Sequence, residues 1–300
     1  MINLMVMATT ETVSPTIITE QEPPIPWSAI AWFAALLIFA YLPVLISLVK
    51  HWNQDEDMGH AFFVPVVAGY IVWCSRTEIF KLKPQPAPLG FVLILWGIVQ
   101  LSIGALGSEL FLQRTAFLIT TVGILLLTGG FAIVRALFFP LFLLLFMIPI
   151  PAVLYNQITF PLQIFASRVA ENVLLILNIP VLRDGNVLEL ASQKLSVVEA
   201  CSGIRSLLSL SFLSLIYGYF FDSRPYMRYL LLATTIPIAI AANAARVSAT
   251  GILSEFNPEL ARGLFHVMEG WVVFMVALVM LVLTHQLISR ILDWQEKRSA

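Results

Sequence analysis

Apolar residues gather in eight runs separated by short polar segments. The runs predict helices near 28–49, 61–75, 88–106, 115–131, 136–154, 205–221, 229–247 and 267–289. Most are close to the roughly 20 residues that an α-helix needs to cross a bilayer. The second run would reach only about 22 Å, so it must either extend back through Met58–His60 or thin the membrane locally. The pattern therefore predicts an all-α integral membrane protein with about eight transmembrane helices.

The region 155–204 has a different pattern. Ile158–Leu177 is apolar but interrupted by a proline and by polar residues, which favours an interfacial or re-entrant helix over a ninth span. Residues 186–199 alternate partly around a polar turn at Ala191–Gln193, which predicts a β-hairpin. We therefore expect a small outer-face segment that leads into the sixth span. The interrupting residues are Pro161, Gln163, Arg168, Glu171 and Asn172.

The two ends of the chain are expected to flank one transmembrane domain. Residues 1–26 contain Glu, Pro and Thr but no Lys or Arg, whereas a cleavable signal peptide has a basic start and a short apolar core. We interpret 1–26 as a retained, disordered tail. The domain is expected to cover 27–290, and 291–300 to form a cytoplasmic C-terminal tail.

Basic residues in the short loops predict the orientation. Lys and Arg near the ends of spans are held on the cytoplasmic side, and four basic groups fall on one side of the eight-span topology. The opposite loops carry one basic residue each, and the first of them also holds three acidic residues. Both termini are therefore predicted to be cytoplasmic. The four groups are Arg76, Lys81 and Lys83; Arg135; Arg224 and Arg228; and Arg290, Lys297 and Arg298.

Composition supports the membrane assignment and excludes one class of partner. Hydrophobic residues make up 59% of the 300 residues and charged residues only 12%, against about a quarter charged in soluble domains. The net charge is −1, and nucleic-acid binding normally requires clustered Lys and Arg. We therefore expect membrane lipids, and no nucleic acid, as partners.

One cysteine stands in a setting that favours chemistry. Cys201 lies in Glu199-Ala200-Cys201-Ser202-Gly203-Ile204-Arg205, just before the sixth apolar run. The predicted topology places Cys201, Arg246 and His266 at the outer ends of the sixth, seventh and eighth spans. Helix N-termini favour anions, so the start of the sixth helix would lower a thiol pKa and could hold an oxyanion.

These three residue types suit attack on a peptide carbonyl. Cys201 would supply the thiolate, and His266 would take its proton and then donate to the leaving amine. Arg246 cannot act as a base, but its guanidinium suits an oxyanion, the thiolate or a substrate carboxylate. The residues thus predict a cysteine peptidase or transpeptidase whose site lies at the outer face of the membrane that the chain spans.

Three segments together resemble the exosortase/archaeosortase family: Ala200-Cys201-Ser202-Gly203-Ile204-Arg205, Asn243-Ala244-Ala245-Arg246-Val247, and the histidine that opens the last span. The resemblance covers about residues 30–290. It implies that Cys201, Arg246 and His266 form the catalytic site of a membrane-embedded transpeptidase. It also implies substrates with a C-terminal Pro-Glu-Pro sorting signal (PEP-CTERM), transfer of the cleaved protein to another anchor, and a host that makes exopolysaccharide. The sequence leaves open whether a lipid, a glycan or water accepts the protein. The expected location is the bacterial inner membrane.

Several further residues are expected to support this site. Arg205 lies one helical turn after Cys201, where it would stabilise the thiolate or bind lipid phosphate. Met58-Gly59-His60-Ala61 stands where many relatives show Ser-His-Gly, so His60 would line the site or receive substrate. No His, Cys and carboxylate cluster has metal-ligand spacing, so neither metal nor organic cofactor is expected. The other supporting residues are Glu199, Ser202, Gly203 and Asn243.

Two other functions fit the same composition. A multi-span transporter would also need about eight apolar helices, but it would place ionisable groups near the bilayer midplane and often show repeated halves. A non-catalytic component of polysaccharide export would not depend on Cys201. Because the notable polar residues crowd one face and no internal repeat is evident, the sequence favours the enzyme.

Overall fold

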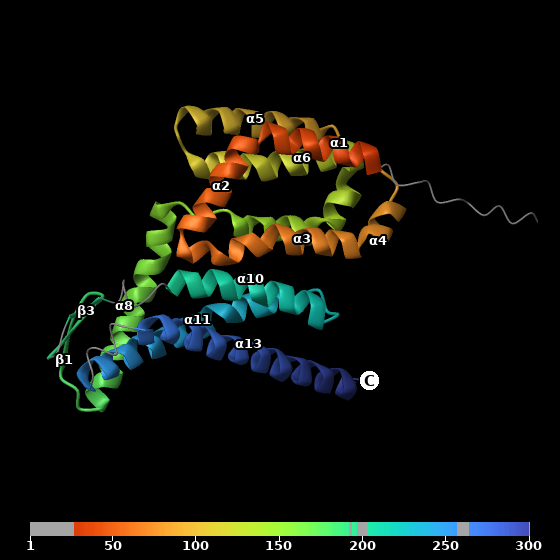
Figure 1. The fold of residues 1–300 in the computed structure, drawn as a ribbon. Coiled ribbons are helices and arrows are strands. Elements are labelled where there is room, and N and C mark those ends of the chain that lie inside the picture. The colour runs from red at the N-terminus through yellow and green to blue at the C-terminus, as the bar shows by residue number, and fades with distance from the viewer. Residues whose placement is uncertain (1–26, 192–193, 197–202, 257–263, 300) are drawn as a thin grey trace, which may run out of the picture.

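Helices running roughly side by side form most of this protein (Figure 1). The computed structural model describes residues 27–191, 194–196, 203–256 and 264–299. The start of α1 and the C-terminal end of the chain lie at the same end of the bundle. The helical elements are α1 (Trp27–Ala40), α2 (Leu42–Gln54), η1 (Glu56–Phe62), α3 (Phe63–Cys74), α4 (Arg76–Lys81), α5 (Leu89–Leu106), α6 (Leu110–Ala136), α7 (Phe138–Leu143), η2 (Leu144–Met147), α8 (Ala152–Ile176), α10 (Gly203–Phe221), α11 (Met227–Phe256) and α13 (Leu264–Ser299).

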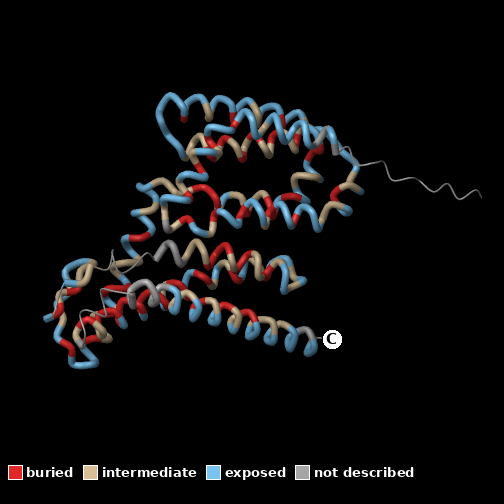
Figure 2. The backbone as a smooth tube through the Cα atoms, in the orientation of Figure 1, coloured by how far each residue is buried: buried red, intermediate tan, exposed pale blue. Residues whose placement is uncertain are grey.

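The outer surfaces of the bundle are strongly apolar. Trp32, Phe39, Leu106 and Trp271 are all more than half exposed. Figure 2 shows buried residues concentrated where helices face one another, while the outward faces of α5 and α13 remain exposed. Apolar surface of this extent is what a lipid-facing protein presents. The coarse prediction of an all-α membrane protein is therefore confirmed.

The number of continuous spans is lower than predicted. Among the described residues, five helices are long and apolar enough to cross a membrane, or seven if each of two bent pairs counts as one span. Leu207–Phe221 of α10 is apolar but shorter. The expected eight uninterrupted spans are thus not all present, because two of the apolar runs contain sharp bends.

The first bend divides the run predicted at 28–49. α1 and α2 meet at 73°, and Pro43 lies in the first turn of α2, where a missing backbone N–H is tolerated. Tyr41 stands at the corner with its hydroxyl 2.6 Å from Thr120 Oγ1 on α6. The buried tyrosine therefore fixes the corner against a neighbouring helix.

The second predicted run is lengthened by a 3₁₀ segment. η1 leads directly into α3, and together they give a candidate span over Asp57–Cys74. Of the two alternatives for this short run, the structure has the extension back through Met58–His60. This extension puts His60 on a packed element rather than in a loop.

The run predicted at 136–154 is not one helix. α7 and η2 end at Met147, and α8 leaves at 86° to them. Ile148 is extended, at φ −94° and ψ 119°, because a residue before proline is pushed out of the helical region; Pro149 and Pro151 flank the break. α8 then runs across the ends of the other helices (Figure 1). This arrangement agrees with an interfacial or re-entrant helix.

A three-stranded antiparallel sheet follows α8. The predicted hairpin is confirmed as β2 (Val187–Leu190) paired with β3 (Lys194–Ser196), but a further strand, β1 (Val181–Asp184), also pairs with β2. Arg183 on β1 forms an ion pair with Glu171 on α8 at 2.7 Å. Leu188 and Leu190 are buried with residues of α8 and α11. The sheet is therefore fastened to the helices at this end.

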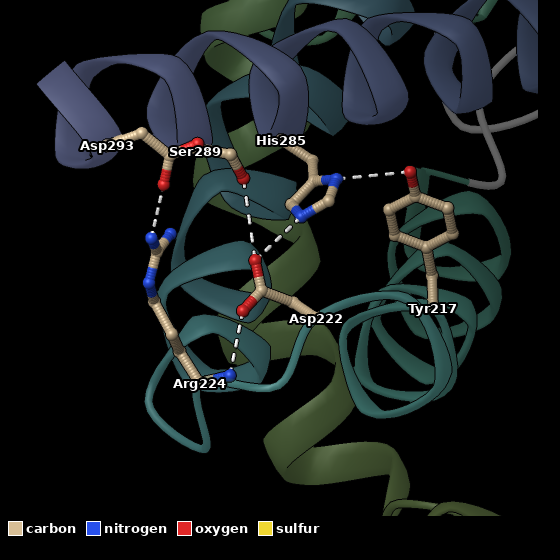
Figure 3. Close-up of polar contacts among 6 residues, drawn as sticks. All are labelled: Tyr217, Asp222, Arg224, His285, Ser289 and Asp293. Atoms are coloured by element: carbon tan, nitrogen blue, oxygen red, sulfur yellow. Dashed lines mark hydrogen bonds and ion pairs between the residues drawn. The ribbon is translucent and has the colours of Figure 1, made fainter.

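A polar cluster at the opposite end joins α10, the following loop and α13 (Figure 3). Asp222 Oδ2 lies 3.1 Å from His285 Nε2, and Tyr217 Oη lies 3.1 Å from His285 Nδ1. The Arg224 amide donates to Asp222 Oδ1 at 2.8 Å, and its guanidinium pairs with Asp293. The Asp222 and His285 side chains are only 8% and 11% exposed. We call Tyr217, Asp222, Arg224, His285, Ser289 and Asp293 the polar clamp.

The Asp222 carboxylate is stabilised in its charged form. Burial alone would raise its pKa, but hydrogen bonds from the Arg224 amide and His285, with the Arg224 charge, outweigh burial and bring the pKa below its usual value. The carboxylate therefore adds stability above about pH 4, its ordinary pKa. That stability is lost as the pH falls through the lower pKa of the folded protein.

We predict that Asp222→Asn lowers the free energy of unfolding by about 1–3 kcal/mol at neutral pH, since a buried charged hydrogen-bond acceptor is lost. The difference from wild type should shrink as the pH falls below about 4 and vanish below the lower pKa of the folded protein, where Asp222 is protonated in both states. Thermal unfolding in detergent between neutral and acidic pH measures both effects. Asp293→Asn is the matched control: its side chain is 57% exposed, so its effect should be smaller. Equal losses for both variants would contradict the role given to Asp222.

Candidate active site

The polar clamp sets the register of α10 and α13. Gly203 precedes Asp222 by nineteen positions, and His266 precedes His285 by nineteen. At 1.5 Å per helical residue, both positions lie about 29 Å from the clamp. α10 and α13 also pack against each other. The first turn of α10 and the first turn of α13 therefore reach about the same level at the far end of the bundle.

α11 runs antiparallel to α10 and brings Arg246 to the same level. Arg246 follows Met227, the first residue of α11, by nineteen positions, which again corresponds to about 29 Å. α11 packs against both α10 and α13. The first turns of α10 and α13 and the Arg246 position therefore lie at about the same distance from the clamp end of the bundle, a distance close to the roughly 30 Å thickness of a hydrocarbon core.

The sequence predicted Arg246 at the end of its helix, but Arg246 lies inside α11. The seventh span was expected to stop near 247, but α11 continues to Phe256. Ala244 and Val247 are buried against α8 and the sheet. This packing surface lets the helix continue beyond the expected boundary.

A buried polar stripe runs along α11. Asn243, Arg246, Thr250 and Ser254 recur at spacings of three or four residues, and all are less than 10% exposed. Residues at this spacing share one helix face. The Thr250 hydroxyl donates to the Arg246 carbonyl at 3.0 Å, and that of Ser254 to the Thr250 carbonyl at 2.7 Å. Sequence reasoning identified Asn243 and Arg246 but missed Thr250 and Ser254, although the spacing was visible.

Several predicted site residues fall outside the described part of the chain. Glu199, Cys201 and Ser202 belong to residues 197–202, which the structure does not describe. Gly203 is the first residue of α10, and Arg205 lies in its first turn. His266 lies in the first turn of α13. The structure describes the helix positions of Arg205 and His266 but not their side chains. The candidate site is therefore defined by positions along the helices.

His60 contacts the N-terminal half of α10, the half that begins with Gly203. Its Nδ1 lies 3.4 Å from the Ser209 hydroxyl, and its ring centroid lies 6.0 Å from that of Phe212. Ser209 is six positions into α10, about 9 Å from its start, and follows Arg205 by four, so the two share a helix face. His60 Nε2 is buried and has no hydrogen-bond partner within the described residues. The imidazole thus lies beside the first turns of α10; sequence reasoning had missed Ser209.

Comparison with known families identifies the chain. Residues 52–283 match the family model described as transmembrane exosortase (Exosortase_EpsH). The chain belongs to the transmembrane exosortase family. The matched exosortase region contains Cys201, Arg246, His266 and His60. No curated protein and no solved structure matches the chain significantly. The resemblance drawn from the three sequence motifs is therefore confirmed at the level of the family.

This exosortase has its basic groups and its candidate site at opposite ends. Three basic groups lie near the end that holds the C-terminus: Arg76 and Lys81 on α4, Arg224 in the polar clamp, and the basic residues in the last turn of α13. α8 and the sheet lie at the other end. The predicted cytoplasmic termini and outer-face site are compatible with this separation. Within the described residues, no three His, Cys, Asp or Glu side chains converge as a metal site would require.

The predicted orientation can be tested through the two cysteines. Cys74 ends α3 and is exposed, near the end that carries α4. In intact bacteria whose outer membrane is permeable to the reagent, a charged maleimide should label Cys201 in a Cys74→Ser variant. The same reagent should label Cys74 in a Cys201→Ser variant only after the inner membrane is opened. The reverse pattern would show that the orientation is wrong.

Proposed function

We propose that this exosortase is a membrane-embedded cysteine peptidase that cleaves C-terminal sorting signals at the outer face of the bacterial inner membrane. The observation that carries the proposal is the common register of α10, α11 and α13. Consecutive Cα atoms are about 3.8 Å apart, so the chain keeps Cys201 close to Gly203. This common level supports the proposal that the thiol, the guanidinium and the imidazole act together at one membrane boundary.

In the proposed reaction, His266 accepts the Cys201 thiol proton, and the sulfur attacks the scissile carbonyl carbon. The resulting tetrahedral oxyanion is stabilised by Arg246 and by the amides at the start of α10. Collapse breaks the C–N bond, and His266 returns the proton to the leaving amine. The product is a thioester between Cys201 and the retained protein. Attack on the thioester by water or by an amine-bearing lipid or glycan then releases the protein and regenerates the thiol.

The position of the candidate site along the bundle matches the point where the implied substrate would leave the bilayer. A substrate with a Pro-Glu-Pro signal followed by a membrane helix presents the signal at the point where its chain leaves the bilayer. Arg246 lies at the corresponding boundary of the exosortase, about 29 Å from the start of α11. The guanidinium also offers two parallel donors to a carboxylate such as the signal's glutamate.

The position of Arg246 along a continuous helix favours an enzyme over a transporter. Intramembrane charges that carry ions or substrates usually lie near the midplane and in broken helices. Arg246 lies near a boundary, in a helix that is continuous from Met227 to Phe256. A role in polysaccharide export without catalysis would leave Cys201 dispensable, and the following experiment distinguishes that possibility.

We predict that Cys201→Ala abolishes cleavage of a co-expressed protein that carries a Pro-Glu-Pro signal, a membrane helix and a basic tail. Loss of a covalent nucleophile typically costs about 10⁴-fold or more in rate. Mobility on a gel and mass spectrometry of the substrate's new C-terminus report the reaction. Cys74→Ala is the matched control and should cleave normally, because Cys74 ends α3 at the other end of the bundle. Cleavage that persists in Cys201→Ala membranes would refute the nucleophile assignment.

A second prediction concerns the shape of the Arg246 side chain. Arg246→Lys keeps the charge but loses the planar, two-pronged donor, so cleavage should slow by about 10²-fold with less effect on KM. Arg246→Gln should slow it further. Single-turnover rates in purified membranes separate the chemical step from substrate binding. A rate for Arg246→Lys equal to wild type would restrict Arg246 to supplying positive charge.

A further inference from the structure

A cavity of about 600 Å³ lies at the end of the bundle opposite the candidate active site. Its walls come from the end of α3, from α4, from the α6–α7 junction, and from α10 with the beginning of α11. Two arginines, Arg135 and Arg228, line it together with the hydroxyls of Ser75, Tyr219 and Tyr229. None of these residues takes part in the proposed cleavage reaction.

Arg228 is held by aromatic rings and keeps hydrogen-bonding capacity. Its guanidinium carbon lies 4.5 Å from the Phe139 ring centroid and 4.9 Å from that of Tyr219, and the two rings stack on each other at 4.9 Å. These are favourable cation–π distances. The Nε atom is buried and has no hydrogen-bond partner within the described residues. The side chain is therefore fixed in place with an N–H donor unused.

Close helix packing sets the position of Arg228. A Cβ atom on Gly218 of α10 would lie only 2.7 Å from the Arg228 Cα. Glycine thus lets the α10 and α11 backbones approach at this point. The approach brings Arg228 against Tyr219, the next residue on α10.

The cavity carries uncompensated positive charge. Neither Arg135 nor Arg228 forms an ion pair with a carboxylate among the described residues. Two guanidinium groups and several hydroxyls form a donor set that suits phosphate oxygens. A phosphate would also supply an acceptor to the unused donor of Arg228.

The rest of the wall is apolar and continues onto the lipid-facing surface. Ile71, Val72, Leu137 and Phe138 line the cavity, and Phe138 is 55% exposed on the outside of the protein. A soluble phosphate ester would leave this apolar wall in contact with water. An amphiphile would place its headgroup on the arginines and its chains along the exposed side chains.

We propose that this cavity binds the phosphate headgroup of an anionic phospholipid at the membrane boundary opposite the catalytic site. Arg228 and Arg135 bind the phosphate oxygens, and Tyr219 and Phe139 hold the Arg228 guanidinium in position. The acyl chains follow the surface formed by Val72 and Phe138 into the bilayer.

Native mass spectrometry of the detergent-solubilised full chain tests this site. Phosphatidylglycerol should be retained at least about ten-fold more strongly than phosphatidylcholine, as expected for charge-assisted contacts. The double variant Arg135→Gln/Arg228→Gln should lose that preference. Arg290→Gln is the matched control: it removes a basic side chain that is exposed on α13 and does not line the cavity, so it should retain phosphatidylglycerol as wild type does.

Two further measurements complete the test. Arg135→Gln alone, which alters an exposed residue, should weaken phosphatidylglycerol retention even if the double variant fails to fold. Excess inorganic phosphate should not displace the lipid, because it cannot contact the apolar wall. Equal retention by wild type and Arg135→Gln, or displacement by phosphate alone, would overturn the proposal.

Discussion

The arrangement of the candidate site depends on a hydrogen-bonded pair of side chains at the other end of the molecule. Asp222 and His285 pair where α10 and α13 leave the bundle, and a helix is rigid enough to carry that alignment along its length. A shift of α13 by one turn would move His266 by about 5.4 Å along the bundle, more than the proposed proton transfer would tolerate. The Arg224–Asp293 ion pair further restricts such a shift, because it joins the loop after α10 to α13.

The positions of the helices follow largely from the sequence, because burial in lipid demands long apolar runs. Their bends follow less directly. Pro149 and Pro151 mark the break before α8 and could have been interpreted as a corner, since two prolines in three residues leave no continuous hydrogen-bond ladder. The corner at Tyr41 is harder to foresee, because it depends on a hydroxyl that bonds to Thr120 of a helix distant in sequence. β1 was missed because its four residues, two of them charged, show no apolar alternation.

Some features of the candidate site could likewise be predicted from the sequence, and others could not. The types of residue proposed to carry the chemistry were evident in the sequence, but Arg246 proved to lie inside α11 and not at its end. Their common level was inferred only from topology, since the contact that aligns them joins Asp222 to a histidine 63 positions later. No local pattern reveals such a pair. Thr250 and Ser254, by contrast, complete a stripe with Arg246 by simple helical spacing and could have been found.

The position of α13 in the chain also governs when the site becomes complete during synthesis. α10 and α11 are joined by a short loop, so they can insert as a hairpin soon after they leave the ribosome. His285 reaches Asp222 only after most of α13 has been made. Until then Arg246 on α11 lacks the neighbouring helix that carries His266. For the proposed peptidase, docking of the last helix would therefore delay assembly of the candidate site until most of α13 has been translated.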